Sequence, residues 1–515
     1  MKTMPTPLRN KIAAASASAL LLLGLGFPAA AQTTSPAQPP AGSVPIATPT
    51  GPLSLQQAVD YALQNNLNVR QSQLSAELTD ATLRLSRGAL LPTANANASQ
   101  SWNYGTSINP LTNVFQNLTT RSNNFSASTQ VTLFSGFQLR NAIKRNTLDY
   151  QASLGDIEEA RNNLSLNVAS VFLQYVLAQE LTRTNEIRLN STRQQVERTE
   201  KLLKAGSVAE SNLLDIQAQQ ATDELNLITS QNQRDLYRLQ LAQLMNLDAA
   251  ATNALTIVTP DLPDPDEQTV FNEDPNATFQ TALGLQPQVR AADLRVQSSS
   301  RNVEVARGAY YPRLTFGAGI FTGYSSARIT PIATGDSISG QPVPVFQRDP
   351  ITGAYGRTNY AVLTPKQAVY EQLPSAFRNQ IKDNLGKQLQ FNLSIPILNG
   401  FQARTNVQRA QIGVKQAELR AEQTRLTLRQ NIQQAYADAL AAQRKYAASK
   451  RQAESLGAAY RNAEIRFNNG LLNGTEFNIA KNNLTAAESS MIQAKYEFIF
   501  RRKVLDFYQG KPLAL

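Results

Sequence analysis

One stretch of the sequence restricts the possible folds more than any other: the long segment from Phe401 to Phe467 contains no proline. Apolar or small residues recur along this stretch at alternating spacings of three and four, for example at Leu428 and Ile432. This spacing is typical of the seam of a coiled coil, so it predicts one continuous helix. At 1.5 Å per residue that helix would be roughly 100 Å long. From this stretch alone, a rod-like coiled-coil protein is an equally good interpretation.

The sequence contains this helix twice. The segment Gly-Phe-Gln-Leu-Arg at 136–140 reappears as Gly-Phe-Gln-Ala-Arg at 400–404, so the residue numbers of the two copies differ by 264. Gly206 matches Gly470 at the same offset, so the helix between the two glycine positions has the same length in both copies. The chain is therefore an internal duplication.

Upstream of each long helix the offset between the repeats is 220. Pro92 matches Pro312 in this register. The offset grows to 264 before Gly400, so the second repeat has an insertion of 44 between these two points.

Composition excludes several classes of protein. The 515 residues include no cysteine and no histidine, which removes thiol catalysis, Ser/His nucleophiles and histidine-based metal sites. We therefore expect no enzyme activity and no cofactor. The net charge of +11 comes without a basic patch interleaved with aromatics, so nucleic acid is not an expected partner.

The N-terminal region indicates export. Residues 1–31 have the charged, apolar and small-residue segments of a secretory signal, and residues 32–52 form a flexible leader rich in Pro, Thr, Ala and Gln. No later run reaches 18 apolar residues, so the sequence predicts no transmembrane helix after this segment. The absence of cysteine also argues against a lipid anchor on an N-terminal cysteine.

Four stretches alternate between apolar and polar residues, which predicts β-strands. They form two hairpins, at 93–135 and 313–397, with a long loop at 325–385 inside the second. In the first hairpin neither strand run is charged, and one face suits hydrocarbon while the other suits water. Four strands cannot close a barrel, so the chain must oligomerise; two copies would give eight strands and three would give twelve.

The predicted domain organisation follows from these patterns. The first repeat, 53–247, contains a helix, the hairpin 93–135, the long helix 137–203, a turn and the helix 209–247. A proline-rich linker, 248–275, leads to the second repeat, 276–509, with a helix, the hairpin 313–397, the long helix 401–467, a turn and the helix 475–508; residues 510–515 are a tail. Lengths suggest that helix 209–247 stacks end to end on helix 276–308, and helix 475–508 on helix 54–88.

The chain resembles the TolC-like outer-membrane efflux family over nearly all of the mature sequence. The residues that carry the resemblance are 53–58 and 62–66, the run Gly-Ala-Leu-Leu-Pro at 88–92, both Gly-Phe-Gln segments, and Lys204-Ala205-Gly206 followed by Leu213-Leu214-Asp215. The resemblance implies a mainly α-helical fold with a small β part. Duplicated antiparallel helical hairpins would form a periplasmic tunnel, and four transmembrane strands per chain would contribute to a twelve-stranded barrel in a homotrimer.

The resemblance also implies a function and partners. The protein would be a passive exit duct of a tripartite efflux or type I secretion system, in contact with outer-membrane lipid. It would dock to a periplasmic adaptor protein and to an inner-membrane pump of the RND or ABC type. The alternative is a structural coiled-coil protein of the envelope, which would be soluble without detergent.

Several residues are candidates for the working parts that the family implies. The helix-tip turns and adaptor contact would be at Gly206, Ser207, Gly470 and Leu471. The periplasmic gate candidates are Glu210, Ser211, Asn212, Asp215 and Glu476; as acids at helix N-termini, three of these would also be favoured by the helix dipole alone.

Two further groups belong to the sheet. The strand–helix junctions are Pro92, Gly136, Pro312 and Gly400. Aromatic residues at 102, 104, 310, 311 and 324 predict a girdle at the barrel rims, with core packing as the competing interpretation. This group is Trp102, Tyr104, Tyr310, Tyr311 and Tyr324.

Overall fold

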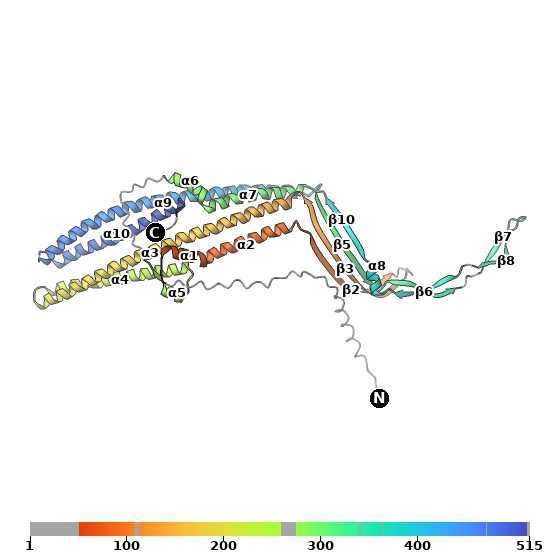
Figure 1. The fold of residues 1–515 in the computed structure, drawn as a ribbon, viewed down its shortest axis with the longest axis horizontal. Coiled ribbons are helices and arrows are strands. Elements are labelled where there is room, and N and C mark those ends of the chain that lie inside the picture. Colours follow the sequence, from red (N-terminus) through yellow and green to blue (C-terminus); the bar gives the residue numbers. More distant parts are fainter. Residues whose placement is uncertain are drawn as a thin grey trace, which may run out of the picture.

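The computed structural model describes residues 51–108, 113–258, 274–338, 340, 342–363, 365–469 and 471–511. The two repeats lie side by side as long helical hairpins that lead into one sheet (Figure 1). The predicted signal peptide and residues 32–50 of the leader lie outside the described residues, as do most of the linker and the end of the tail. Within the described ranges, every helix is too short or too polar to cross a membrane.

The two long helices confirm the prediction from the proline-free seams. Helices α3 (Gln138–Lys204) and α9 (Gln402–Asn468) each contain 67 residues and begin one residue later than expected. The shorter helices α4 (Glu210–Leu244) and α10 (Gly474–Tyr508) each contain 35 residues. Helix α4 packs along α3 and α10 packs along α9, so each repeat contains an antiparallel hairpin (Figure 1).

The predicted helices 54–88 and 276–308 are each divided in two. The first consists of α1 (Leu55–Asn65) and α2 (Leu67–Gly88), and the second of α6 (Pro275–Leu285) and α7 (Pro287–Arg307). The breaks fall at Asn66 and Gln286, both with extended backbone. Proline disfavours helical conformation in the residue before it, so Pro287 explains the second break.

The end-to-end stacking of the helices differs from the prediction. Asn66 donates its side-chain amide to the carbonyl oxygen of Leu244 at 2.9 Å, so α4 ends where α2 begins. Tyr508, at the end of α10, packs in one cluster with Phe279 of α6. Helix α4 is therefore continued by α2, and α10 by α6 and α7 (Figure 1). The end-to-end pairing that the helix lengths suggested, α4 with α6 and α7, is thus wrong.

The four predicted strands form one antiparallel sheet with the order β10-β5-β3-β2. They are β2 (Thr93–Ile108), β3 (Phe115–Ser135), β5 (Arg313–Ser325) and β10 (Gly386–Ser394). Strand β10 ends at Ser394, before the predicted residue 397, because Ser394 pairs with Arg313, the first residue of β5. Strands β2 and β10 are the two edges of the sheet.

The predicted loop 325–385 contains regular structure. Strands β6 (Ile329–Ile338) and β9 (Gln367–Pro374) form one two-stranded ribbon, and β7 (Pro342–Arg348) and β8 (Tyr355–Leu363) form another. Helix α8 (Phe377–Asp383) follows, and its buried Gln380 exchanges two hydrogen bonds with the backbone of Ser325. The ribbons extend away from the helices beyond the sheet (Figure 1).

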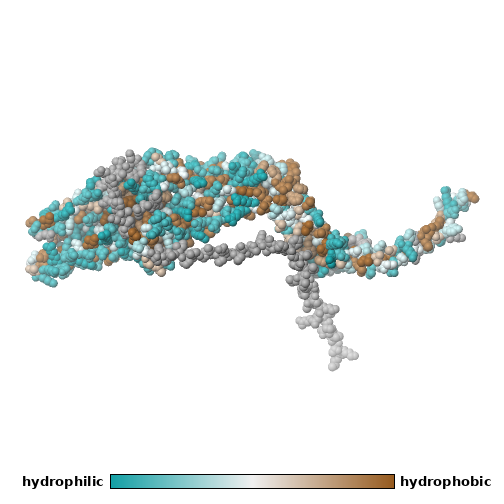
Figure 2. Space-filling view, viewed as in Figure 1, coloured by the Kyte–Doolittle hydropathy of each residue, from teal (hydrophilic) through white to brown (hydrophobic). Residues whose placement is uncertain are grey.

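The largest apolar core lies midway along α3, where α1, α4 and α10 also meet. Its buried members include Val168, Phe172, Val176, Leu241 and Met245. Part of the linker closes this region: α5 (Ala249–Ala254) is followed by β4 (Thr256–Ile257), which pairs in parallel with β1 (Pro52–Leu53). Figure 2 shows mostly hydrophilic side chains over the helices, while hydrophobic side chains gather where the helices meet the sheet.

Candidate functional site

The hairpin tips have one backbone hydrogen bond in common. Gly206 adopts a left-handed conformation with φ +73°, and the amide of Ser207 donates to the carbonyl oxygen of Leu202 at 2.9 Å. In the second hairpin the equivalent amide, that of Leu471, donates to Arg466 at 2.8 Å. At the first tip this bond is that of a glycine-terminated helix C-cap. Gly470 itself lies outside the described residues.

The predicted gate residues lie in the first turns of the returning helices. Glu210, Ser211 and Asp215 are exposed on α4, and Asn212 is half-buried beside them. Glu476 is exposed on α10, the other hairpin, where its backbone amide donates to the N-cap side chain of Asn473 at 2.8 Å. The structure therefore brings four of the five residues together and places the fifth at the other tip.

A buried polar network further along the helices was not predicted from the sequence. Lys481 of α10 donates its Nζ to Thr192 Oγ1 of α3 at 2.8 Å. Thr192 donates to Asp223 Oδ2 of α4 at 2.5 Å. The three residues are 7%, 0% and 1% exposed, so this chain of hydrogen bonds joins the two hairpins where water has little access. We call Arg188, Thr192, Asp223 and Lys481 the inter-hairpin network.

The charges of this network do not balance. Gln219 completes the hydrogen bonding of Asp223 with a bond of 3.0 Å to Oδ1. Arg188 is also buried, and its Nη2 has no hydrogen-bond partner within the described part of the chain. Burial lowers the pKa of Lys481 and of Arg188, against the opposing attraction of Asp223. Within the network two cations thus share one buried carboxylate, which costs stability wherever water is excluded. Glu488, half-buried on α10, attracts Arg188 from outside the network.

The second tip contains aromatic packing that the first lacks. The rings of Phe467 and Phe477 stack with centroids 4.6 Å apart, and Tyr460 lies 5.6 Å from Phe477. At the repeat offset of 264, the first hairpin has Leu203 in place of Phe467 and Leu213 in place of Phe477. Aromatic side chains therefore pack at the second tip, where the first tip has aliphatic side chains.

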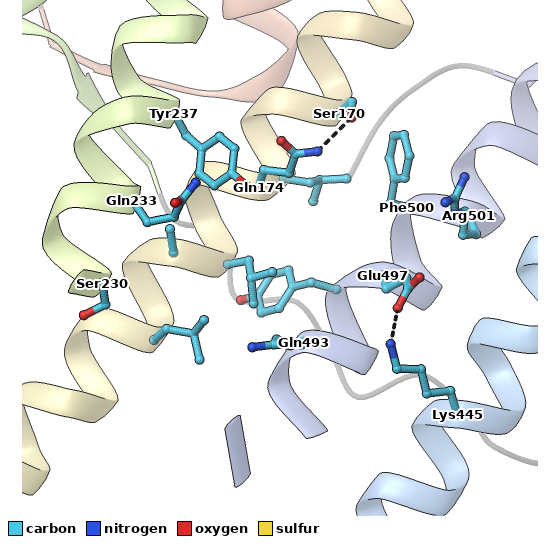
Figure 3. A pocket seen from close by; sticks show the side chains of 15 residues that line it. Ser170, Gln174, Ser230, Gln233, Tyr237, Lys445, Gln493, Glu497, Phe500 and Arg501 are labelled. Atoms are coloured by element: carbon cyan, nitrogen blue, oxygen red, sulfur yellow. Dashed lines mark hydrogen bonds and ion pairs between the residues drawn. The ribbon is translucent and has the colours of Figure 1, made fainter. Parts of the chain in front are cut away.

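A cavity of about 460 Å³ lies between the hairpins, further from the tips than the network (Figure 3). Its floor is apolar, with Leu173 and Tyr496 among its residues, and Lys445 pairs with Glu497 at 2.8 Å on one side. No histidine or cysteine lines it, because the chain contains neither. The part of the chain that the structure describes also has no group of acids that could hold a metal ion.

The strand–helix junctions repeat an unusual backbone. Gly136 and Phe137 are both left-handed, with φ +59° and +62°, as are Gly400 and Phe401, with φ +56° and +64°. Pro92 and Pro312 each directly precede a strand of the sheet. The four junction residues therefore lie where sequence analysis placed them, at the level at which strands become helices.

The predicted girdle aromatics lie at two levels of the sheet. Tyr310 and Tyr311 are half-exposed between α7 and β5, at the helical end. Trp102 and Tyr104 are exposed on β2 toward the other end, and Tyr324 lies near their level on β5. Tyr324 packs on Phe377 with ring centroids 5.2 Å apart, so core packing accounts for part of its position.

The family model described as outer membrane efflux protein matches residues 58–247 and 381–508. The pyoverdine export outer membrane protein OpmQ of Pseudomonas putida is 26% identical over 259 residues, which are 50% of this chain and 52% of that protein. The match thus spans about half the length of this curated relative.

Solved structures show the same fold. The Campylobacter jejuni CmeC outer membrane channel is 17% identical and superposes with a TM-score of 0.69, covering 90% of this chain and 87% of that one. A crystal structure of CusC, described in connection with folding and transmembrane channel formation, is also 17% identical and superposes with a TM-score of 0.69. The match covers 89% of this chain and 92% of CusC. The family model covers more than half of the sequence, and its gap includes the ribbons β6 to β9. The chain therefore belongs to the outer membrane efflux protein family, as its resemblance predicted.

Proposed function

We propose that the protein is a passive exit duct in the outer membrane, through which an efflux or secretion system passes its substrates from the periplasm to the exterior. Its location in the outer membrane follows from the family. The single observation that carries the proposal is the sheet, which has one polar and one apolar face and continues directly into the long helices.

The two faces of the sheet have the chemistry that a membrane pore needs. Around a hollow on one face lie Asn95, Gln130 and Gln390, all polar and uncharged. The opposite face presents Ala96, Ala127, Ala318, Ile320 and Leu389, and Lys387 lies on it near the start of β10, away from the helices. A wall that is polar inside and apolar outside separates a water-filled channel from lipid.

The edges of the sheet support an assembly of three copies. In lipid, the unpaired backbone groups of β2 and β10 would cost several kcal/mol each, so other copies must pair with them. Eight strands enclose an interior that side chains fill, whereas a larger barrel leaves a lumen. Three copies, with twelve strands, are therefore the smallest number that forms an open duct.

The hairpin tips support contacts with partners on the periplasmic side. Gly206, Ser207 and Leu471 are exposed at the far end of the helices. We infer that a periplasmic adaptor docks on these turns and links the duct to an inner-membrane pump of the RND or ABC type. The relative described as a pyoverdine export outer membrane protein supports a role in export.

The inter-hairpin network supports a gate near the same end. Separation of α10 from α3 and α4 would break the bond between Lys481 and Thr192 and admit water to Asp223. Buried charges favour the joined state only while their hydrogen bonds persist. We infer that the network holds the two hairpins of each copy together in the closed duct.

Planar-bilayer recording tests the proposed function. The full-length protein, purified in detergent and shown to be oligomeric, is expected to insert and give discrete, long-lived conductance steps. An oligomeric protein that inserts but never conducts, even with the network disrupted by Asp223→Ala, would contradict the duct. A protein that stays dispersed and folded without detergent would instead favour a structural coiled coil.

A further inference from the structure

The two unpaired edges of the sheet lie on different repeats, β2 on the first and β10 on the second. We infer the register in which β10 of one copy pairs with β2 of the next: Asn392 faces Ser99, and Ser394 faces Asn97. This inference rests on the proposed assembly, and it specifies the surface on which the copies meet. We call this surface the seam.

The internal repeat provides the rule for this register. In the first hairpin of strands Ala96 pairs with Ala127, and in the second Phe316 pairs with Phe391. The first members of the two pairs differ by 220 in sequence number and the second members by 264, the offsets of the sequence duplication. The ends agree as well, because Thr93 with Gln130 corresponds to Arg313 with Ser394. The two strand hairpins are therefore equivalent residue by residue.

The structure already contains one junction between the repeats, the ladder of β3 with β5. In that ladder Ser128 pairs with Gly319, and Gln130 pairs with Gly317. Strand β10 is the equivalent of β3, and β2 is the equivalent of β5. Applying the two offsets to this ladder gives the seam, in which each copy repeats the junction that it contains internally.

Glycines at the strand–helix junction support the same equivalence. A Cβ on Gly308 would meet the side chain of Gln138 and would lie 2.8 Å from the Gly136 carbonyl oxygen. Their repeat equivalents, Gly88 and Gly400, have nothing within 4 Å of the position that a Cβ would take. Gly88 also lacks a left-handed backbone. Within one chain nothing requires a glycine at 88, whereas a seam built like the internal junction does.

The end of β10 supplies an independent observation. Strand β3 continues to Ser135 because Phe134 pairs with Leu314. The equivalent of Phe134 is Leu398, which is 92% exposed and follows the end of β10. In the inferred register Leu398 faces Ala94 of the next copy, so the seam would extend β10 and cover this side chain.

Disulfide cross-linking tests the register directly, because the chain has no cysteine of its own. In the full-length protein, Ser99→Cys combined with Asn392→Cys places one thiol on each edge. Oxidation in outer-membrane vesicles is expected to give a covalent three-copy species on a non-reducing gel. The control, Asn95→Cys with Asn392→Cys, is off register by four residues, about 13 Å along the strand. That distance exceeds the reach of a disulfide, so the control is expected to cross-link about tenfold less.

Substitution of Gly88 tests whether this residue lies at the seam. Gly88→Ala is expected to lower the temperature at which the three-copy species dissociates in detergent, because the added Cβ would meet Gln402 of the next copy. Gly413→Ala is the control: it also lies in a helix with nothing within 4 Å, but its repeat equivalent is Asp149, so a side chain fits there. Equal dissociation temperatures for the two variants would remove the glycine from the seam.

The outcomes separate the register from the function. Equal cross-linking of the matched and off-register pairs would overturn the register, as would a three-copy particle whose matched pair stays uncrosslinked. In either case the proposed duct would stand. If light scattering finds only single copies of the wild-type protein in detergent, the proposed duct and the seam both fail.

Discussion

The two helical hairpins have the same lengths and different interiors. Helices α3 and α9 both have 67 residues, and α4 and α10 both have 35. The first hairpin contributes Thr192 and Asp223 to the inter-hairpin network, but the equivalent residues of the second are Leu456 and Ala487. The second hairpin contributes Lys481, whose equivalent is Gln217. The two repeats thus have helices of the same length, but each hairpin has different residues at the positions that join it to the other.

The largest effect is expected when Asp223 of the first hairpin is replaced by alanine, the residue at the equivalent position of the second, Ala487. Asp223→Ala leaves Lys481 buried without a carboxylate and leaves Arg188 with only the attraction of Glu488, which is expected to cost about 3–5 kcal/mol. Hydrogen exchange of the α4 and α10 amides near the network should accelerate, and single-channel conductance should rise. Glu224→Ala removes the same charge from an exposed neighbouring position and should change neither measurement. Equal effects of the two variants would show that the network does not hold the hairpins together.

The aromatic tip of the second hairpin is expected to respond almost as strongly. Phe477 is 4% exposed and stacks on Phe467, so Phe477→Ala should cost about 3–4 kcal/mol of local stability. Its equivalent Leu213 is only half-buried, and Leu213→Ala should cost about half as much. Hydrogen exchange at the two tips measures both values. Similar losses at the two tips would contradict a difference in their packing.

The N-caps of α10 and α4 differ, and exchanging their capping residues should have a smaller effect on stability. Asn473 caps α10 through its side chain, whereas the equivalent residue of the first hairpin, Ala209, makes no such bond. Asn473→Ala is expected to destabilise the start of α10 by about 1 kcal/mol, and Ala209→Asn to stabilise the start of α4 by a similar amount. Amide exchange in the first turns would show opposite changes. A change of the same sign in both variants would contradict this assignment.

The exposed acids at the tips should affect conductance more than stability. Asp215→Ala combined with Glu476→Ala alters side chains in water, so stability should change by no more than about 0.5 kcal/mol. If the acids line the aperture, the double variant will show altered conductance and weaker preference for cations in planar bilayers. Unchanged conductance and selectivity would remove both residues from the gate.

The smallest expected contrast is a dependence on pH. Burial lowers the pKa of Lys481 in the folded protein, so over the alkaline range up to pH 10.5 the unfolded chain binds more protons there. The wild type should therefore gain stability with rising pH relative to Lys481→Gln, the variant with the residue of the first hairpin. Thermal unfolding at several alkaline pH values measures the difference. Parallel profiles for the two proteins would indicate that Lys481 is not effectively desolvated.

The lengths of the long helices could be predicted because both segments lack proline and both end near a glycine. The break at Gln286 also has a signal, in Pro287, whereas no proline marks the break at Asn66. The stacking of α4 on α2 could not be inferred, since a linker of this length allows either partner.

The predicted tip residues lie at the tips, because a short turn fixes where each helix reverses. The inter-hairpin network has a weaker signal: Lys481 is a charged residue four positions after the buried Phe477, on the apolar side of α10. Periodicity identifies such a position as buried, but it does not say which helix of the other hairpin faces it. The partners Thr192 and Asp223 therefore required the structure.

The central claim is that one chain supplies a third of a closed wall. Native mass spectrometry of the wild-type protein, released from detergent micelles, measures the number of copies directly. The account predicts a single species of three copies. A folded species of one copy, or a stable species of two, would contradict it.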